Sequence, residues 1–561
     1  MRCLSVLLLA CALPAWNCHR SAAADYFLTI GGGPNPQSNQ ISLERNVLFQ
    51  QRTLQRVRPD QPPHAIFYAD GRSPQRDLQF RDDSLQPSAA QTWMTRLFGS
   101  SDSIGLRYRS SDIPGVQGPA RLAFLDQHFQ QMAKTLNSGD RLIIYVSGHG
   151  GSSQEFDFYP GFGGEALSES NEFNTSIALW KDEEQRVKDF CDWLDRLRPD
   201  VEVVLVMVQC YSGGFGHSIF HQGDARLGLN PRPRCGFFAQ RHDRPAAGCT
   251  PEIEEADYQE YSTFFWAALG GQSRTGQAVA GVDYDGDGQV SLAEAHAYAV
   301  LASDTIDIPV RTSDYFLRRY SRIGPRIDAS AVPASSEPTD DTPSSTFFMR
   351  LGQAIAGEVP EEAEASTAGK AEMVGGLLTL ATPIERALEL ARPDRRAIVE
   401  QLCIELKFDT QKPVSAVQNR LKKAKKKEQE MEGVLQAAVG LQTAQTALSE
   451  AVRVEWPELV ELEYAPIVSQ LTGELAEEFT QLIEEHPQAE AWVNADAQRQ
   501  KVTEKQLKLA KREAKIHRLY WQLRSILLEA NLTQVAPADI AARYQQLLQQ
   551  EEQTLTIAAT P

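Results

Sequence analysis

The chain has 561 residues, a hydrophobic fraction of 42% and a formal net charge of −18 at pH 7. This length exceeds that of an ordinary single domain, so we expect two or three domains. The acidic balance argues against a general nucleic-acid-binding protein, which presents a broad basic surface.

The first 24 residues have the features of a secretory signal peptide. Arg2 gives a positive start, residues 4–14 an apolar core, and residues 22–24 a small-residue cleavage site. The core is too short to span a bilayer as a helix, and no later segment is long and apolar enough. An alternative is a lipoprotein signal ending at Cys11, which would add a lipid anchor. We therefore expect export to the periplasm, the cell envelope or the extracellular space, with no transmembrane segment.

Five cysteines follow the signal segment, which is an odd and small number for a chain of this size. They are Cys191, Cys210, Cys235, Cys249 and Cys403. This count argues against a disulfide scaffold and leaves at least one thiol outside any internal pair. Cys235 and Cys249 are close enough in sequence to pair across a loop, which makes Cys210 the candidate reactive thiol.

Short apolar runs alternate with segments of helical periodicity along the first half of the chain. The runs predict strands at 26–30, 65–68, 141–148, 203–209 and 235–239. The periodic segments predict helices at 42–51, 119–136, 182–197 and 258–269, the first of them capped by Ser42. Nearly wholly apolar strands that alternate with helices indicate a mostly parallel sheet covered by helices on both faces.

Two of these strands end at a reactive side chain that is set among glycines. His149 follows the first and Cys210 the second, and ligands of such sheets bind outside the carboxyl ends of the strands. A thiol attacks as the thiolate, so an imidazole within reach supplies the base that it needs. We predict a Cys210–His149 catalytic pair, with the N–H groups of Gly150 and Cys210 stabilising an oxyanion. His217 and His221 are alternative bases because they are near Cys210 in sequence.

The order of strand, His149-Gly150, long helix, strand and Cys210-x-Ser-Gly resembles the caspase–haemoglobinase fold, and legumain-like cysteine peptidases in particular, over residues 25–325. The resemblance implies that His149 is the general base or acid, Cys210 the nucleophile and Gly150 an oxyanion donor. The chain has Gly148 where legumains carry an acidic residue, and Val-Gln at 208–209 where they carry Glu-Ala.

The segment at 39–44 matches the place of the family's basic residue for the P1 side chain, but it contains no arginine at the matching point. Gln40 and Ser42 are therefore the candidate substrate-binding residues, and the P1 specificity stays open.

Residues 283–294 match the calcium-binding loop of an EF-hand position by position. The oxygen ligands at positions 1, 3, 5, 7, 9 and 12 fall on Asp283, Asp285, Asp287, Gln289, Ser291 and Glu294, and Gly288 is at position 6. A helix is expected after the loop, whereas residues 270–281 before it are loop-like. We predict a single, structural Ca²⁺ site.

The second half of the chain has a different composition. Residues 329–345 are rich in Pro, Ser, Thr and Asp and predict a linker between a peptidase domain at 25–328 and a separate all-α domain at 346–561. Apolar residues from Leu509 to Ile526 recur at three–four spacing, which is typical of a helical hairpin or coiled coil. The basic run at 422–427 is followed by glutamates, which is more typical of a solvated helix face than of a membrane or nucleic-acid patch.

Two functions from different classes follow from these features. The first is an exported cysteine endopeptidase that hydrolyses protein or peptide substrates through a thioacyl-enzyme, with transfer to an amine as a variant and with the helical region masking the cleft of a zymogen. The alternative is a catalytically silent, calcium-stabilised scaffold that binds partners or itself through its C-terminal helices. A serine hydrolase is excluded, because no Gly-x-Ser-x-Gly elbow is present.

Overall fold

The computed structural model describes residues 23–82, 84, 87–98, 105–153, 171–324, 373–436, 439–457 and 471–555. The expected signal peptide, apart from its last two residues, and the expected linker at 329–345 lie outside the described residues. Within these ranges, no helix combines the length and the apolar character needed to cross a membrane.

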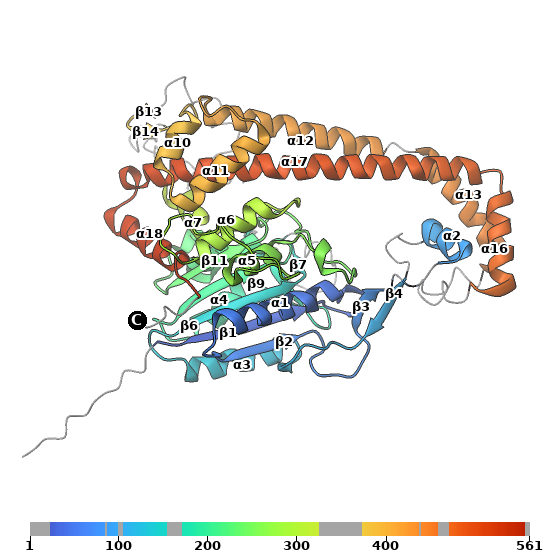
Figure 1. The fold of residues 1–561 in the computed structure, drawn as a ribbon, viewed down its shortest axis with the longest axis horizontal. Coiled ribbons are helices and arrows are strands. Elements are labelled where there is room, and N and C mark those ends of the chain that lie inside the picture. Colours follow the sequence, from blue (N-terminus) through green and yellow to red (C-terminus); the bar gives the residue numbers. More distant parts are fainter. Residues whose placement is uncertain are drawn as a thin grey trace, which may run out of the picture.

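A seven-stranded sheet of order β12-β11-β10-β6-β1-β2-β5 forms the centre of the molecule (Figure 1). All neighbouring strands are parallel except β12, which pairs antiparallel with β11. The strands are β1 (Asp25–Gly32), β2 (His64–Tyr68), β5 (Val116–Gly118), β6 (Arg141–Gly148), β10 (Glu202–Met207), β11 (Arg234–Phe238) and β12 (Val310–Arg311). The mostly parallel sheet predicted from the apolar runs is confirmed.

Helices cover both faces of this sheet because successive strand residues point to opposite sides. Ile143 packs with α1 (Ile41–Val57), α5 (Tyr261–Gly270) and α6 (Leu292–Ala302) on one face. Its neighbour Ile144 packs with α3 (Leu122–Thr135) and α4 (Val187–Asp195) on the other. A further helix, α7 (Thr312–Tyr320), follows β12 and contributes to both cores.

Two details of the sequence prediction are wrong. Ser42 does not cap the first helix: the N-cap of α1 is Gln40, and Ser42 is buried within the first turn. The helix expected at 182–197 is shorter, because residues 183–186 form a strand, β9 (Glu183–Arg186). The pairing of β9 with β8 (Ser176–Leu179), which also pairs with β7 (Gly150–Gly151), satisfies the backbone there and overrides the helical periodicity.

The stretch between β2 and β5 contains structure that the sequence did not predict. A two-stranded ribbon joins β3 (Leu78–Arg81) to β4 (Leu106–Arg109), and α2 (Ala89–Phe98) lies between them in the sequence. The ribbon lies beside the α/β body, whereas α2 packs on the C-terminal helices (Figure 1).

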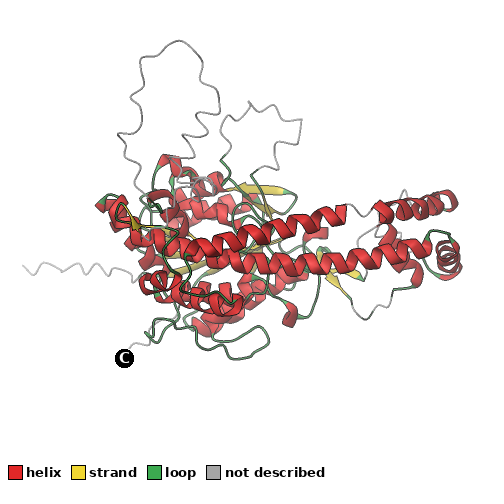
Figure 2. Ribbon diagram, turned by 90° about the horizontal axis from the view of Figure 1, so that it is seen from above, coloured by secondary structure: helices red, strands yellow, loops and turns green. Residues whose placement is uncertain are grey.

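The C-terminal region is α-helical, as expected, after a short ribbon of β13 (Met373–Val374) and β14 (Leu377–Leu378). Its helices are α10 (Ile384–Leu390), α11 (Pro393–Leu406), α12 (Val414–Gln436), α13 (Val439–Glu455), α16 (Gly473–Glu485), α17 (Ala489–Val535) and α18 (Ala538–Glu551). Helices α12 and α17 run side by side and extend beyond the sheet as an arm (Figures 1 and 2). At its far end α13, α16 and α17 pack against α2, with Trp93 and Trp492 in ring contact at 5.2 Å.

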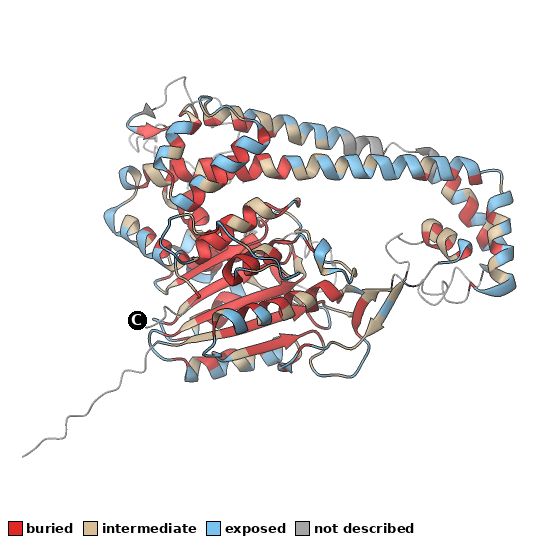
Figure 3. Ribbon diagram, viewed as in Figure 1, coloured by how far each residue is buried: buried red, intermediate tan, exposed pale blue. Residues whose placement is uncertain are grey.

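The body-side half of the helical region shares its core with the sheet. Leu532 of α17 and Tyr544 of α18 belong to the same buried cluster as Phe316 of α7. A fully buried ion pair of 2.8 Å between Asp314 of α7 and Arg395 of α11 joins the two parts. Figure 3 shows that buried residues fill the body, whereas the outer arm is mostly exposed. The change in amino-acid composition after the expected linker therefore does not separate two independent hydrophobic cores.

Candidate functional site

The chain segments that carry His149 and Cys210 meet at the carboxyl edge of neighbouring strands β6 and β10. They approach each other closely at Gly150, where a Cβ atom would lie only 2.3 Å from the carbonyl oxygen of Cys210 and 2.7 Å from Cγ of Gln209. Gly148 is equally constrained, since a Cβ there would lie 2.8 Å from the carbonyl oxygen of Gly32 in β1. The glycines on both sides of His149 therefore permit the close approach of three chain segments.

Two oxygen acceptors fix the ring of His149. Its Nε2 lies 2.9 Å from the carbonyl oxygen of Ser38 and 3.0 Å from Oε1 of Gln40. A carbonyl oxygen only accepts, so Nε2 carries the proton and Nδ1 is the basic nitrogen. Burial lowers the pKa of His149 below its usual 6.5, and the hydrogen bond to Ser38 partly offsets this. Gln40, which we predicted to bind substrate, thus contacts the imidazole itself.

Residues 241–250, here called the cover loop, lie on the thiol of Cys210. The backbone N–H of Ala246 donates to the Cys210 Sγ at 3.2 Å, and Sγ lies 3.8 Å from the carbonyl oxygen of the same residue. Tyr211, the residue after the cysteine, is left-handed with φ 59° and donates its N–H to the carbonyl of Arg244 at 3.0 Å. Cys210 is half-buried as a result.

Helix α17 holds the cover loop from outside the α/β body. Arg244 forms an ion pair of 3.0 Å with Glu513, and Arg241 lies 2.7 Å from Nε2 of His517. Burial opposes ionisation of Glu513, but the hydrogen bond from His517 and the charge of Arg244 lower its pKa to about 2. Sequence reasoning missed these residues because no local pattern connects positions about 270 residues apart.

The remaining predicted residues near the site have packing roles. The Ser42 hydroxyl accepts from the backbone N–H of Thr250 at 2.9 Å and is fully buried, so it anchors the end of the cover loop. His217 stacks on Phe173 with ring centroids 3.6 Å apart, and burial holds its pKa well below 6.5. His221 is exposed in the short 3₁₀ segment His221–Gly223.

The disulfide considered between Cys235 and Cys249 is not formed. Cys235 is buried in β11, whereas Cys249 is exposed in the cover loop, and both are thiols. Cys249 is therefore a second accessible thiol near the site, which any labelling experiment has to take into account.

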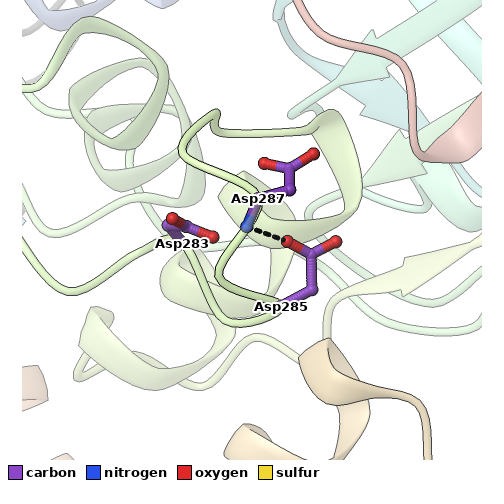
Figure 4. A group of neighbouring side chains, drawn as sticks. All are labelled: Asp283, Asp285 and Asp287. Carbon is purple, nitrogen blue, oxygen red and sulfur yellow. Dashed lines mark hydrogen bonds between the residues drawn. The ribbon is translucent and has the colours of Figure 1, made fainter.

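The predicted calcium loop brings three of its carboxylates together. Oxygens of Asp283, Asp285 and Asp287 lie within 4.8 Å of one another, and all three residues are exposed (Figure 4). The N–H groups of Gly286 and Gly288 donate to Asp283 and fold the loop around this point. An all-oxygen donor set at this spacing fits Ca²⁺.

The last two predicted ligands are engaged with the backbone of the same loop. Oε1 of Glu294 accepts from the N–H of Tyr284 at 2.6 Å and of Asp285 at 3.2 Å, and its Oε2 accepts from the N–H of Ser291. Ser291 caps α6 through a reciprocal capping box with Glu294. Gln289 donates its N–H to Asp287. As expected, a helix follows the loop directly, and none directly precedes it, because α5 ends at Gly270.

Neither a protein-family model nor a curated protein matches the chain. Among solved structures, it is similar to the crystal structure of protein GSU0716 from Geobacter sulfurreducens, with a TM-score of 0.21 and 11% identity over 39% of this chain and 74% of that one. A TM-score this low supports no conclusion about the fold, so the fold class is taken from the sheet order described above. The chain is an α/β protein with a mostly parallel seven-stranded sheet and a helical C-terminal region.

Proposed function

We propose that this chain is an exported cysteine endopeptidase, similar to the legumain-like peptidases of the caspase–haemoglobinase fold, with Cys210 as nucleophile and His149 as base. The close approach of Gly150 to the Cys210 carbonyl carries the proposal, because it brings both strand ends to one point. The lowered pKa of His149 supports it, since a neutral imidazole at pH 7 can accept a proton.

The reaction divides peptide hydrolysis into two steps. Nδ1 of His149 takes the thiol proton as Sγ of Cys210 attacks the scissile carbonyl carbon, and the N–H groups of Gly150 and Cys210 bind the oxyanion. The imidazolium then gives its proton to the departing amine, which leaves a thioester. Water, deprotonated by the same imidazole, hydrolyses this thioester and restores the thiol. An amine in the place of water gives transpeptidation.

The conformation described above is the latent form of this enzyme. A peptide that reaches Sγ of Cys210 has to displace Ala246 of the cover loop, whose N–H donates to that sulfur. The anchors of the loop on Glu513 and His517 come from α17, so the helical region maintains latency without itself filling the site. The covered thiol also favours the second candidate, a silent calcium-stabilised scaffold acting through its C-terminal helices.

Both candidate functions include a structural Ca²⁺ ion in the loop at 283–294. The side chains of Asp283, Asp285 and Asp287 would hold the ion together with the main-chain carbonyl of Gln289. Ser291 and Glu294 complete the register, and Glu294 also fixes the loop by its backbone hydrogen bonds. The ion supplies charge neutralisation and rigidity, with no part in the reaction at Cys210.

Labelling with a fluorescent thiol-reactive peptidyl probe separates the two candidates. With Glu513→Gln in every protein to loosen the cover loop, we expect the parent protein and Cys249→Ser to be labelled alike, Cys210→Ala to lose the label, and His149→Ala to react at least tenfold more slowly. Cys249→Ser is the matched control, because this thiol is exposed nearby. Equal labelling of all four proteins would exclude the peptidase and leave the scaffold. A mixed peptide library then gives the P1 preference.

A further inference from the structure

Two thiols that are not buried lie at the contact between the cover loop and the end of β10. Among the cysteines in the described part of the chain, Cys191, Cys235 and Cys403 are buried, whereas Cys210 is half-buried and Cys249 is exposed. The two accessible thiols therefore belong to one contact, since Cys249 is part of the loop that lies on Cys210. A cysteine buried in an apolar core is inert, whereas a thiol that solvent reaches can be oxidised.

The path of the cover loop places Cys249 between Cys210 and the first turn of α1. On one side, Ala246 donates its N–H to Sγ of Cys210 at 3.2 Å. On the other side, Thr250 donates its N–H to Oγ of Ser42 at 2.9 Å, and its carbonyl oxygen accepts from the N–H of Ser42 at 3.3 Å. Cys249 is three residues from Ala246, a stretch that spans at most about 11 Å. The loop is thus fixed on both sides of Cys249 and keeps it near the nucleophile.

The surroundings of Cys249 keep its thiol protonated when Cys210 is a thiolate. Desolvation of the sulfur and the negative charge of a Cys210 thiolate raise the pKa of Cys249, so this charge reaches Cys249. The thiolate is the form of cysteine that peroxides oxidise, so Cys210 reacts before Cys249. Oxidation of Cys210 removes its negative charge, and the thiol of Cys249 then ionises more easily.

We propose that Cys210 and Cys249 form a reversible disulfide that locks the cover loop over the nucleophile. The bond requires Cα atoms about 4.4–6.8 Å apart, which the short stretch from Ala246 to Cys249 allows. A peptide can displace Ala246 only when the loop moves away, so a covalent bond within the same contact keeps the site closed. The block of catalysis rests on the proposed function, whereas formation of the bond does not.

The oxidant in this reaction is hydrogen peroxide, which is nearly as small as water and therefore reaches the half-buried Cys210. The Cys210 thiolate attacks one peroxide oxygen, which breaks the O–O bond and gives a sulfenic acid and hydroxide. The hydroxide takes the proton that His149 received from the thiol. The sulfur of Cys249 then attacks the sulfenic sulfur, and the hydroxyl group leaves with the Cys249 proton as water. Two thiols lose two electrons in total, one peroxide becomes two water molecules, and a small thiol reverses the bond by exchange.

Oxidation of the full chain with hydrogen peroxide tests the bond directly by mass spectrometry. We expect the wild type to lose the mass of two hydrogen atoms and its tryptic peptides 197–226 and 242–274 to be joined. With dimedone present, which captures sulfenic acids, Cys249→Ser should be labelled at Cys210 at least tenfold more than the wild type, because it lacks the second thiol. Dithiothreitol should restore both thiols of the wild type, whereas excess peroxide should oxidise Cys210 of Cys249→Ser irreversibly.

Cys403→Ala is the matched control, because it removes a buried thiol of α11 and should behave as the wild type does. An unchanged wild-type mass, a crosslink between Cys249 and Cys235, a dimer joined through Cys249, or equal dimedone labelling of wild type and Cys249→Ser would each overturn the proposal. The peptidyl probe on Glu513→Gln tests the proposed function separately, since it should label the reduced protein and not the oxidised one. Joined peptides without probe labelling after reduction would keep the disulfide and reject the peptidase.

Discussion

At the scale of single residues, the environment of His149 determines whether its ring is charged and which ring nitrogen carries the proton. Burial favours the neutral ring and the two oxygen acceptors at Nε2 orient it, so that Nδ1 is free of a proton at pH 7. Gln40 is therefore a positioning residue for the base. Under the proposed function, the segment 39–44 then supplies no residue to a P1 pocket, since Ser42 is buried under the cover loop.

Substitution of Gln40 should shift the pH profile. Activity falls with decreasing pH as His149 becomes protonated, so the acid limb of kcat/KM should lie below pH 6.5. Gln40→Leu removes an acceptor that stabilises the imidazolium, which moves this limb to lower pH and reduces kcat/KM about tenfold, the equivalent of one hydrogen bond. Gln40→Glu adds a negative charge, which moves the limb to higher pH. A purely structural role for Gln40 would leave the limb in place in both variants.

At the scale of elements, the cover loop and α17 act together. Two arginines of the loop contact the helix: Arg244 pairs with Glu513, and Arg241 pairs with His517. Both partners on α17 are almost fully buried. The adjacent segment takes part as well, because Asp307 accepts from the N–H of Ala247 at 2.8 Å, and its carbonyl accepts from Arg518 of α17 at 2.7 Å. The loop is thus held by side-chain contacts from α17 and from the segment around Asp307.

Loosening this contact should uncover the thiol. Glu513→Gln removes the charge that pairs with Arg244, so that a charged hydrogen bond, worth about 1.5–3 kcal/mol, becomes a neutral one worth about 1 kcal/mol. We expect the rate of Cys210 modification by a small thiol reagent, measured in a Cys249→Ser background, to rise about fivefold. Arg499→Gln breaks an ion pair with Asp496 on the same helix, far from the loop, and should change nothing. Equal rates for wild type and Glu513→Gln would show that Glu513 does not hold the loop closed.

At the scale of the whole molecule, the C-terminal end of the chain is part of the α/β body. Thr554 forms an isolated antiparallel bridge with Ser291 of the calcium loop, and Gln553 accepts from the N–H of Leu292 at 2.9 Å. Gln553 also donates to Glu202 at the start of β10. The predicted calcium loop therefore pairs with the end of its own chain, and we expect calcium binding there to stabilise the docking of α18.

Removal of calcium should lower the stability of the entire protein. A ligand at about 100 times its Kd adds about 2.7 kcal/mol, which corresponds to a Tm decrease of roughly 2 °C on chelation for a protein of this size. Differential scanning fluorimetry in the presence of 1 mM CaCl₂ or of EGTA measures this decrease in Tm. Asp285→Asn with Asp287→Asn should abolish the difference, whereas Asp189→Asn on α4, an exposed carboxylate outside the loop, should retain it. A Tm that is indifferent to calcium in the wild type would contradict a filled site.

The sequence by itself determined five of the seven strands of the central sheet and the placement of His149 and Cys210 near its edge. Strand and helix signals are local, because they reflect side-chain periodicity and the φ, ψ preferences of nearby residues. The three aspartates of the calcium loop also come from one short segment, so their convergence follows from the register of that loop.

Only the tertiary structure decided what covers the thiol and what completes the core. The contacts of Ala246 with Cys210 and of Arg244 with Glu513 join segments that are distant in sequence, and no local pattern records them. Residues 183–186 show the same effect of tertiary structure: their periodicity predicted a helix, but pairing with β8 makes them a strand. Contacts between distant segments depend on how the whole chain packs, so they are absent from any window of the sequence.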